Sequence, residues 1–127
     1  DGKLTIVTDW RITLSIGSNV YFNDNCMLSC LGKITIGDNT LFGCNVNVFD
    51  NNHKFGTSGV NRECKAGVIE IGKNCWIASN AVILKGAKIG DNCVIGAGRV
   101  VNCEIPEGSI VRQKNNLHIE KIVENDT

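Results

Sequence analysis

The chain has 127 residues, 43% of them apolar, and its 13 lysines and arginines balance 13 aspartates and glutamates. This length suits a single domain, 1–127, and the composition is too ordinary for a disordered chain. Because there is no block of basic residues and no apolar run long enough to span a bilayer, we expect neither a nucleic-acid partner nor a membrane span.

The first residues, DGKLTIVTDW, lack the apolar stretch of a signal peptide. The seven cysteines contain no C-x-x-C pair, which argues against a disulfide framework or a usual zinc site. Cys26, Cys75 and Cys93 each follow a large apolar residue by four positions, where a free thiol serves as a small apolar side chain. Free thiols indicate a reducing compartment, so we predict a cytoplasmic protein.

The N-terminal part, about 12–50, repeats an apolar residue at steps of six. After four anchors the pattern shifts by two residues and then resumes, and we interpret the shift as a small bulge at 31–33. The anchors before and after the shift are Ile16, Phe22, Leu28 and Ile34, then Ile36, Phe42 and Val48. The next segment, about 51–68, breaks the pattern and is predicted to be an inserted loop.

The second block, about 69–111, keeps the six-residue step without a shift. Its anchors are Ile71, Ile77, Ile83, Ile89, Ile95 and Val101. A period of six fits neither an α-helix nor simple strand alternation, and a β-sandwich would not keep one register over thirty residues. Three six-residue units form one triangular coil of a parallel β-helix, with glycine and asparagine tolerating positive φ at its corners. Pro106 is expected to end the repeats, and 112–127 forms a tail.

The stretch IGKNCWIASNAVILKGAKIGDNCVIGAGRVV resembles the hexapeptide-repeat acyltransferases. Within that family, the chain is most similar to galactoside and maltose acetyltransferases and to O-acetyltransferases of bacterial surface polysaccharides, over roughly 12–111. The resemblance implies an all-β, left-handed parallel β-helix that forms homotrimers with active sites between subunits. It also implies acetyl-CoA as the acyl donor and no metal.

The resemblance extends to residues of the catalytic and acceptor sites. His53 follows Asn45 by eight residues, the spacing seen in galactoside acetyltransferase, which implies that His53 is the general base. Asn23 matches the position whose amide contacts the acceptor sugar, and Trp76 matches a tryptophan beside the channel for acetyl-CoA and the acceptor. Asp50 is a candidate for orienting the His53 imidazole, although a loop aspartate is more often a turn former.

For the donor, the resemblance implies that the pantetheine arm contacts small residues matching Ser79, Ala97 and Gly98. Two positions depart from the family pattern: many relatives have serine at Arg99 and proline at Lys85. Both side chains could add positive charge near the CoA phosphates, or could simply be solvated. The tail lacks the Gly-x-Pro-Ala segment that many relatives place over the adenine.

A neutral histidine can take the proton of a sugar hydroxyl, and a positioned base typically contributes about 10²- to 10⁴-fold. We therefore predict an acetyl-CoA-dependent O-acetyltransferase acting on a sugar or polysaccharide intermediate. N-acetylation of an amino sugar and a non-catalytic trimeric scaffold remain alternatives. A carbonic anhydrase on this scaffold needs three histidines per site, and the chain has only His53 and His118, the latter predicted to be structural.

Overall fold

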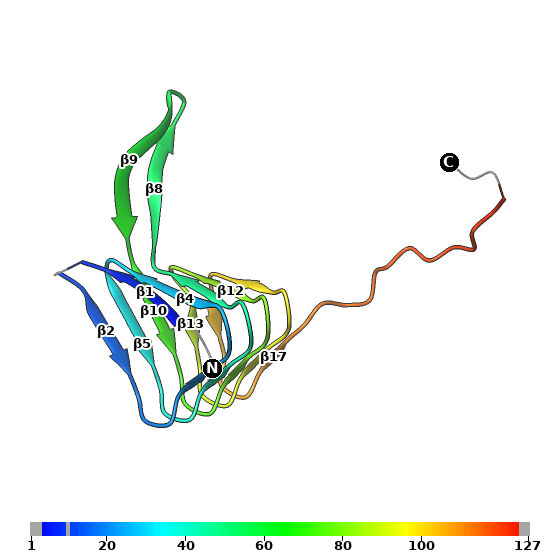
Figure 1. The fold of residues 1–127 in the computed structure, drawn as a ribbon, viewed down its shortest axis with the longest axis horizontal. Helices are drawn as coiled ribbons and strands as arrows, with labels where there is room; N and C mark the ends of the chain where they lie inside the picture. The colour runs from blue at the N-terminus through cyan, green and yellow to red at the C-terminus, as the bar shows by residue number, and fades with distance from the viewer. Residues whose placement is uncertain (1–3, 10, 125–127) are drawn as a thin grey trace.

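The computed structural model describes residues 4–9 and 11–124 and is a triangular β-solenoid from which one hairpin projects (Figure 1). Three five-stranded parallel sheets form its walls. Sheet A contains β1 (Leu4–Thr8), β4 (Cys26–Cys30), β7 (Asn47–Phe49), β12 (Val82–Leu84) and β15 (Val100–Val101). Sheet B contains β2 (Thr13–Ile16), β5 (Lys33–Ile36), β10 (Val68–Ile71), β13 (Lys88–Ile89) and β16 (Glu104–Ile105).

Sheet C completes the triangle with β3 (Tyr21–Phe22), β6 (Leu41–Phe42), β11 (Trp76–Ile77), β14 (Val94–Ile95) and β17 (Ile110–Val111). The chain visits the sheets in the order A, B, C, so each passage through all three makes one coil. The predicted all-β parallel helix is confirmed. Within the described ranges, no helix is long and apolar enough to cross a membrane.

The six-residue anchors form the core. Every anchor of the second block is at most 3% exposed, which confirms the prediction: Ile71, Ile77, Ile83, Ile89, Ile95 and Val101. Phe42 is fully buried and stacks on Phe22 of the previous coil at a centroid distance of 4.6 Å. Ile16, in contrast, is 37% exposed, because β2 lies at the end of sheet B and has only one neighbour.

The coils are not all equally long. Val82 pairs with Val100, 18 residues later, whereas Met27 pairs with Asn47, 20 residues later. The two additional residues lie where the bulge was predicted: the chain bends at Leu31 and Gly32 between β4 and β5. Pro106 does not end the repeats, since it lies in a turn of the last coil and β17 still pairs with β14 beyond it.

Asparagine and glycine have different roles at the corners. Asn19, Asn39, Asn74 and Asn92 adopt φ between 56° and 60°, as expected for residues that tolerate the left-handed region. The glycine that precedes each of them by two positions does not have positive φ. It is needed for space: a Cβ at Gly37 would lie 2.6 Å from the Gly72 carbonyl carbon of the next coil. The prediction of positive φ is therefore correct for asparagine and wrong for these glycines.

The cysteines predicted to be small core residues are buried. Cys26, Cys75 and Cys93 are at most 2% exposed, and each thiol contacts a backbone carbonyl of the adjoining coil at 3.1–3.2 Å. Burial raises the pKa of the Cys26 and Cys75 thiols above the ordinary value. All seven cysteines are free.

The predicted inserted loop is instead an antiparallel β-hairpin of β8 (Asn51–Gly56) and β9 (Gly59–Ala66). Its two-residue turn, Thr57–Ser58, lies between Gly56 and Gly59, and Gly59 has φ 99°. Gly59 follows the turn directly, and glycine adopts this backbone conformation without steric cost. The hairpin leaves the solenoid between β7 and β10, so it stands on the edge where sheets A and B meet, while the tail after Val111 extends away from the coils (Figure 1).

Candidate functional site

The hairpin is anchored at its base and exposed along its length. The Gly67 amide donates to the Asp50 carbonyl at 2.7 Å and closes the base, and the Asn51 side chain donates to the Ser29 carbonyl at 3.2 Å. From Asn52 to Ala66 every residue is exposed. We call the line of corners from which it rises, between sheets A and B, the hairpin edge. Residues 30–32, 50, 67 and 85–86 stack along it.

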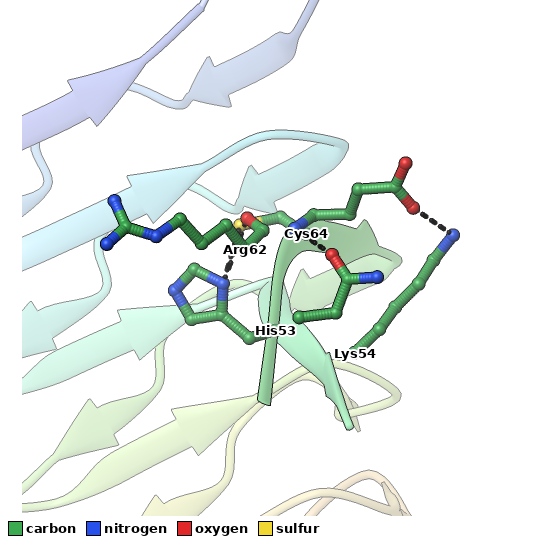
Figure 2. Close-up of polar contacts among 6 residues, drawn as sticks. His53, Lys54, Arg62 and Cys64 are labelled. Carbon is green, nitrogen blue, oxygen red and sulfur yellow. Dashed lines mark hydrogen bonds and ion pairs between the residues drawn. The ribbon is translucent and has the colours of Figure 1, made fainter. Parts of the chain in front are cut away.

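His53 is held by the opposite strand of the hairpin. It pairs with Cys64, and its Nδ1 lies 3.2 Å from the Arg62 carbonyl oxygen (Figure 2). A carbonyl oxygen can only accept, so in this hydrogen bond Nδ1 carries the proton. The neutral ring then has its lone pair on Nε2. The contact therefore selects the tautomer in which Nε2 is available as a base.

Cys64 is a second reactive group beside this ring. Its Sγ lies 3.7 Å from His53 Nδ1, and the residue is exposed. The cysteine pattern did not single it out, because it does not follow a large apolar anchor by four positions. A hairpin with its turn at Thr57–Ser58 and no irregularity would instead place Arg62 opposite His53, and a shift in pairing between His53 and Phe55 brings Cys64 to that position. No feature of the sequence indicates this shift.

The two faces of the hairpin carry different side chains. Cys64 lies opposite His53 and shares its face, whereas Lys54, the next residue of β8, points to the other face, where its side chain pairs with Glu63. Figure 2 shows this: the His53 and Arg62 side chains extend to one side and Lys54 extends to the opposite side. Lys54 Nζ lies 2.9 Å from Glu63 Oε2, and this hydrogen bond lowers the pKa of the Glu63 carboxyl.

A pocket of about 800 Å³ adjoins the hairpin, within the size range of small-molecule sites. Residues of both strands and one residue of the next coil line it: Asn52, His53, Lys54, Phe55, Cys64, Lys65 and Lys85. Lys85 reaches it from the hairpin edge, where its aliphatic carbons pass over Gly67. The pocket thus combines a candidate base with an excess of positive charge.

Asp50 does not contact His53. Its side chain is fully buried, and its two carboxylate oxygens accept hydrogen bonds from the Leu31 and Gly32 amides, both at 2.8 Å. Asn51 Nδ2 donates to the same carboxylate at 3.0 Å. Asp50 therefore satisfies the two amides at the bend of the preceding coil. The structure does not bring the predicted dyad together.

Burial also makes this corner unfavourable for a second negative charge. The pKa of the Cys30 thiol is raised to about 11, first by desolvation and then by the negative charge of Asp50. The Cys30 side chain is fully buried in the core below the corner. It is consequently an inert thiol, in contrast with the exposed Cys64.

Asn23, Ser79, Ala97 and Gly98, predicted to bind the acceptor or the donor, lie on a different edge, where sheet C turns into sheet A; we call it the serine edge. The Cys44 amide donates to Ser79 Oγ at 3.0 Å, and the Gly98 amide donates to the Ser79 carbonyl at 3.0 Å. The stack along this edge comprises residues 23–25, 43–45, 78–80 and 96–98. Ala97 and Gly98 are exposed, and a Cβ on Gly98 would meet no atom within 4 Å.

The other predicted residues are distributed over the two edges and sheet C. Arg99 lies at the end of the serine edge and donates from Nη2 to Gln113 Oε1 at 2.8 Å. Trp76 is on sheet C and is 51% exposed. Lys85 belongs to the hairpin edge, in the pocket of His53, and not with the small residues Ala97 and Gly98. One chain therefore presents the candidate base on one edge and most of the residues predicted to bind the donor on another.

His118 lies in the tail and has no contact with this pocket among the described residues. Its Nε2 lies 3.0 Å from Glu120 Oε2, and both side chains are largely exposed. The described residues hold no group of three or more histidine, cysteine or acidic side chains placed for a metal ion.

Comparisons with known proteins agree with the repeat. Residues 69–101 match the family described as bacterial transferase hexapeptide (six repeats). The chain is 42% identical over 94 residues to galactoside O-acetyltransferase of Escherichia coli strain K12. The aligned region covers 73% of this chain and 46% of that protein.

Two solved structures are similar in fold. A maltose O-acetyltransferase from Clostridium difficile 630 superposes with a TM-score of 0.72 at 32% identity, covering 85% of this chain and 60% of its own. A hexapeptide-repeat acetyltransferase of Vibrio cholerae, in complex with acetyl coenzyme A, superposes with a TM-score of 0.74 at 27% identity, covering 86% and 62%. The chain thus spans between about half and three fifths of the length of these relatives.

Proposed function

We propose, from the match of residues 69–101 to the bacterial transferase hexapeptide family, that the chain is an acyltransferase that moves an acetyl group from acetyl-CoA to a sugar hydroxyl. The acceptor is a sugar or polysaccharide intermediate made in the cytoplasm. Similarity to galactoside and maltose O-acetyltransferases supports the reaction class. The observation that carries the proposal is the hydrogen bond between His53 and the Arg62 carbonyl, which leaves Nε2 free to act as a base.

In this mechanism, His53 Nε2 takes the proton of the sugar hydroxyl as its oxygen attacks the thioester carbonyl carbon. Nδ1 keeps its own proton and donates it in the hydrogen bond to the Arg62 carbonyl, so the imidazolium that forms is stabilised by a hydrogen bond already in place. When the tetrahedral intermediate collapses, the carbon–sulfur bond breaks and the imidazolium returns its proton to the leaving thiolate. Asp50 supports this step only indirectly, by fixing the corner from which the hairpin rises.

Small residues support the placement of the donor on the serine edge. Ala97 and Gly98 are exposed, and open space surrounds the Gly98 α-carbon, so a thin pantetheine arm could approach the backbone there. A similar protein is known with acetyl coenzyme A bound. Ser79 lies on the same edge, but its hydroxyl already accepts from the Cys44 amide.

The division of the site between two edges supports a homotrimer. The base on the hairpin edge and the groove on the serine edge are separated by sheet A within one chain. If the hairpin edge of one subunit faces the serine edge of the next, three equivalent sites form around a threefold axis. The exposed hairpin would then become one wall of each site.

The direct experiment compares His53→Ala with His118→Ala, since His118 lies in the tail. Release of CoA thiol is measured with acetyl-CoA and a panel of sugars. We expect His53→Ala to lower the rate by about 10²- to 10⁴-fold without changing the unfolding transition, and His118→Ala to match the wild type. Full activity of His53→Ala would refute the mechanism.

Mixing two inactive variants tests the shared site. Ala97→Trp should block the donor groove, and His53→Ala removes the base, so each trimer alone is inactive. Refolding the two together should restore part of the activity, because some sites then combine an intact His53 with an intact serine edge from another subunit. No recovery from a mixture whose trimers are shown to contain both chains would argue that one chain forms the whole site.

A further inference from the structure

We infer that the acceptor carries an anionic group, a carboxylate or a phosphate, and that the Arg62 guanidinium binds this group beside the hydroxyl to be acetylated. The inference rests on the proposed function and names the class of its substrate. It starts from an asymmetry of charge. The chain is neutral overall, but 51–66 contains three cationic residues, Lys54, Arg62 and Lys65, and one acidic residue, Glu63.

Arg62 lies on the same face of the hairpin as the base. Cys64 is opposite His53, and the pairing of β8 with β9 then shifts between His53 and Phe55, so strand alternation alone does not fix the face of Arg62. Figure 2 shows the Arg62 and His53 side chains extending in the same direction. An acceptor whose hydroxyl lies at His53 therefore has the Arg62 guanidinium on the same side of the hairpin.

The Arg62 guanidinium has no acidic partner within 4.0 Å among the residues that the structure describes. The one carboxylate of the hairpin, Glu63, is paired with Lys54 on the other face. A planar guanidinium offers two parallel N–H donors that match a carboxylate or a phosphate. Arg62 is thus free for an anionic ligand, whereas Lys54 is already paired.

Two lysines raise the positive potential further. Lys65 and Lys85 both line the pocket of His53, and neither forms an ion pair within 4.0 Å in the described part of the chain. Lys65 is opposite Asn52 and Lys85 belongs to the next coil, so we assign both lysines attraction of the acceptor rather than direct contact. A hollow of about 580 Å³ that includes Arg62 adjoins the first pocket through Lys54 and Phe55.

The donor does not account for Arg62. In acetyl-CoA the phosphates are separated from the thioester by the whole pantetheine arm, and the thioester must lie at His53 when the hydroxyl attacks. A cation beside His53 therefore contacts the acceptor and not the CoA phosphates. The CoA phosphates remain a possible partner only for cations far from His53, such as Arg99 at the serine edge.

The test uses three acceptors with the same ring stereochemistry: galactose, galactose 1-phosphate and galacturonic acid. Wild type, Arg62→Gln, Arg62→Lys and Lys73→Gln are compared at one ionic strength. Lys73→Gln is the matched control, because it removes one positive charge from a turn on the third edge of the triangle, between sheets B and C. Substituting the Arg62 side chain leaves its backbone carbonyl in place, so the hydrogen bond to His53 is kept.

We expect kcat/KM of the wild type to be at least tenfold higher for one anionic sugar than for galactose. Arg62→Gln should abolish this preference through KM of the anionic sugar, with an unchanged pH profile and an unchanged KM for acetyl-CoA. Arg62→Lys should retain part of the preference, and Lys73→Gln all of it. Which anionic sugar is preferred distinguishes a carboxylate from a phosphate.

Equal kcat/KM for the three sugars in the wild type would overturn the inference. So would a variant Arg62→Gln that raises KM for acetyl-CoA and leaves the sugar preference intact. If no sugar is acetylated, the proposed function fails, and calorimetric binding of the two anionic sugars decides the inference separately. Binding that is lost in Arg62→Gln supports it, and absent or unchanged binding refutes it.

Discussion

In the solenoid every inner coil packs between two neighbours, whereas the hairpin packs on neither of its faces. The solenoid buries at least one anchor from each strand of its inner coils, and no buried side-chain nitrogen or oxygen in the described residues lacks a hydrogen-bond partner. The hairpin exposes all residues from Asn52 to Ala66. The difference separates stability from chemistry: substitutions in the solenoid should change folding, and substitutions in the hairpin should change catalysis.

Two phenylalanines give the sharpest contrast in stability. Phe42 is fully buried in sheet C and Phe55 is 81% exposed on the hairpin. Phe42→Ala should lower the free energy of unfolding by about 3–5 kcal/mol, because it removes a buried ring and leaves a cavity. Phe55→Ala should leave it unchanged. Denaturant unfolding of the two variants checks this, and a comparable loss in both would break the distinction.

Two glycines extend the contrast to the backbone. Gly37→Ala places a methyl carbon 2.6 Å from the Gly72 carbonyl carbon, whereas a Cβ at Gly56 meets nothing within 4 Å. Backbone atoms cannot turn aside as a side chain can, so we expect Gly37→Ala to cost about 1–3 kcal/mol. Gly56→Ala should be neutral. The midpoint of thermal unfolding is the measurement, and a neutral Gly37→Ala would mean that the coils can separate locally.

Asp50 lies where the two regions join, so its substitution tests the boundary. Asp50→Asn leaves only one side-chain acceptor for the amides of Leu31 and Gly32, and we expect a loss of about 1–3 kcal/mol. The activity of the folded protein should stay within a few-fold of wild type. A hundredfold loss of activity in a fully folded variant would instead restore the dyad with His53.

The last contrast between the two regions concerns the reactivity of their thiols. The pKa of Cys30, raised to about 11, leaves about one thiolate in a thousand at pH 8, and its side chain is also fully buried. Cys64 is exposed beside His53. Iodoacetamide at pH 8 should therefore label Cys64 and the exposed Cys103, but not Cys30, as measured by peptide mass spectrometry. Labelling should inactivate the wild type and spare Cys64→Ser; rapid labelling of Cys30 would contradict the buried corner.

The sequence predicted the solenoid well, because a six-residue period is local information that each coil repeats. Ile77, Ile83 and Ile95 could be assigned to the core by counting alone, and they are fully buried. The hairpin could not be predicted in this way: 51–66 has no apolar alternation, and its register depends on a two-residue turn. The role of Asp50 depends on amides 18 and 19 residues earlier, which only the stacking of coils brings near.

The candidate site was predicted residue by residue, but its arrangement was not. Spacing and resemblance identified His53 and the small residues Ala97 and Gly98. They could not show that these lie on different edges, since that depends on which corner of the triangle each residue occupies. Arg62 was missed because its two contributions, a carbonyl for His53 and a free guanidinium on the same face, exist only once β8 and β9 are paired.

The hairpin departs from the third of five coils, between β7 and β10. In a stack of this kind, opening begins at the ends, where a coil has one neighbour to lose, and moves inward with rising cost. Amide protons of β7 and β10 should accordingly exchange with deuterium more slowly than those of β2 or β17. The hairpin that carries the His53 imidazole thus projects from the coil that opens last, and this coil stays folded while the outer coils open and close.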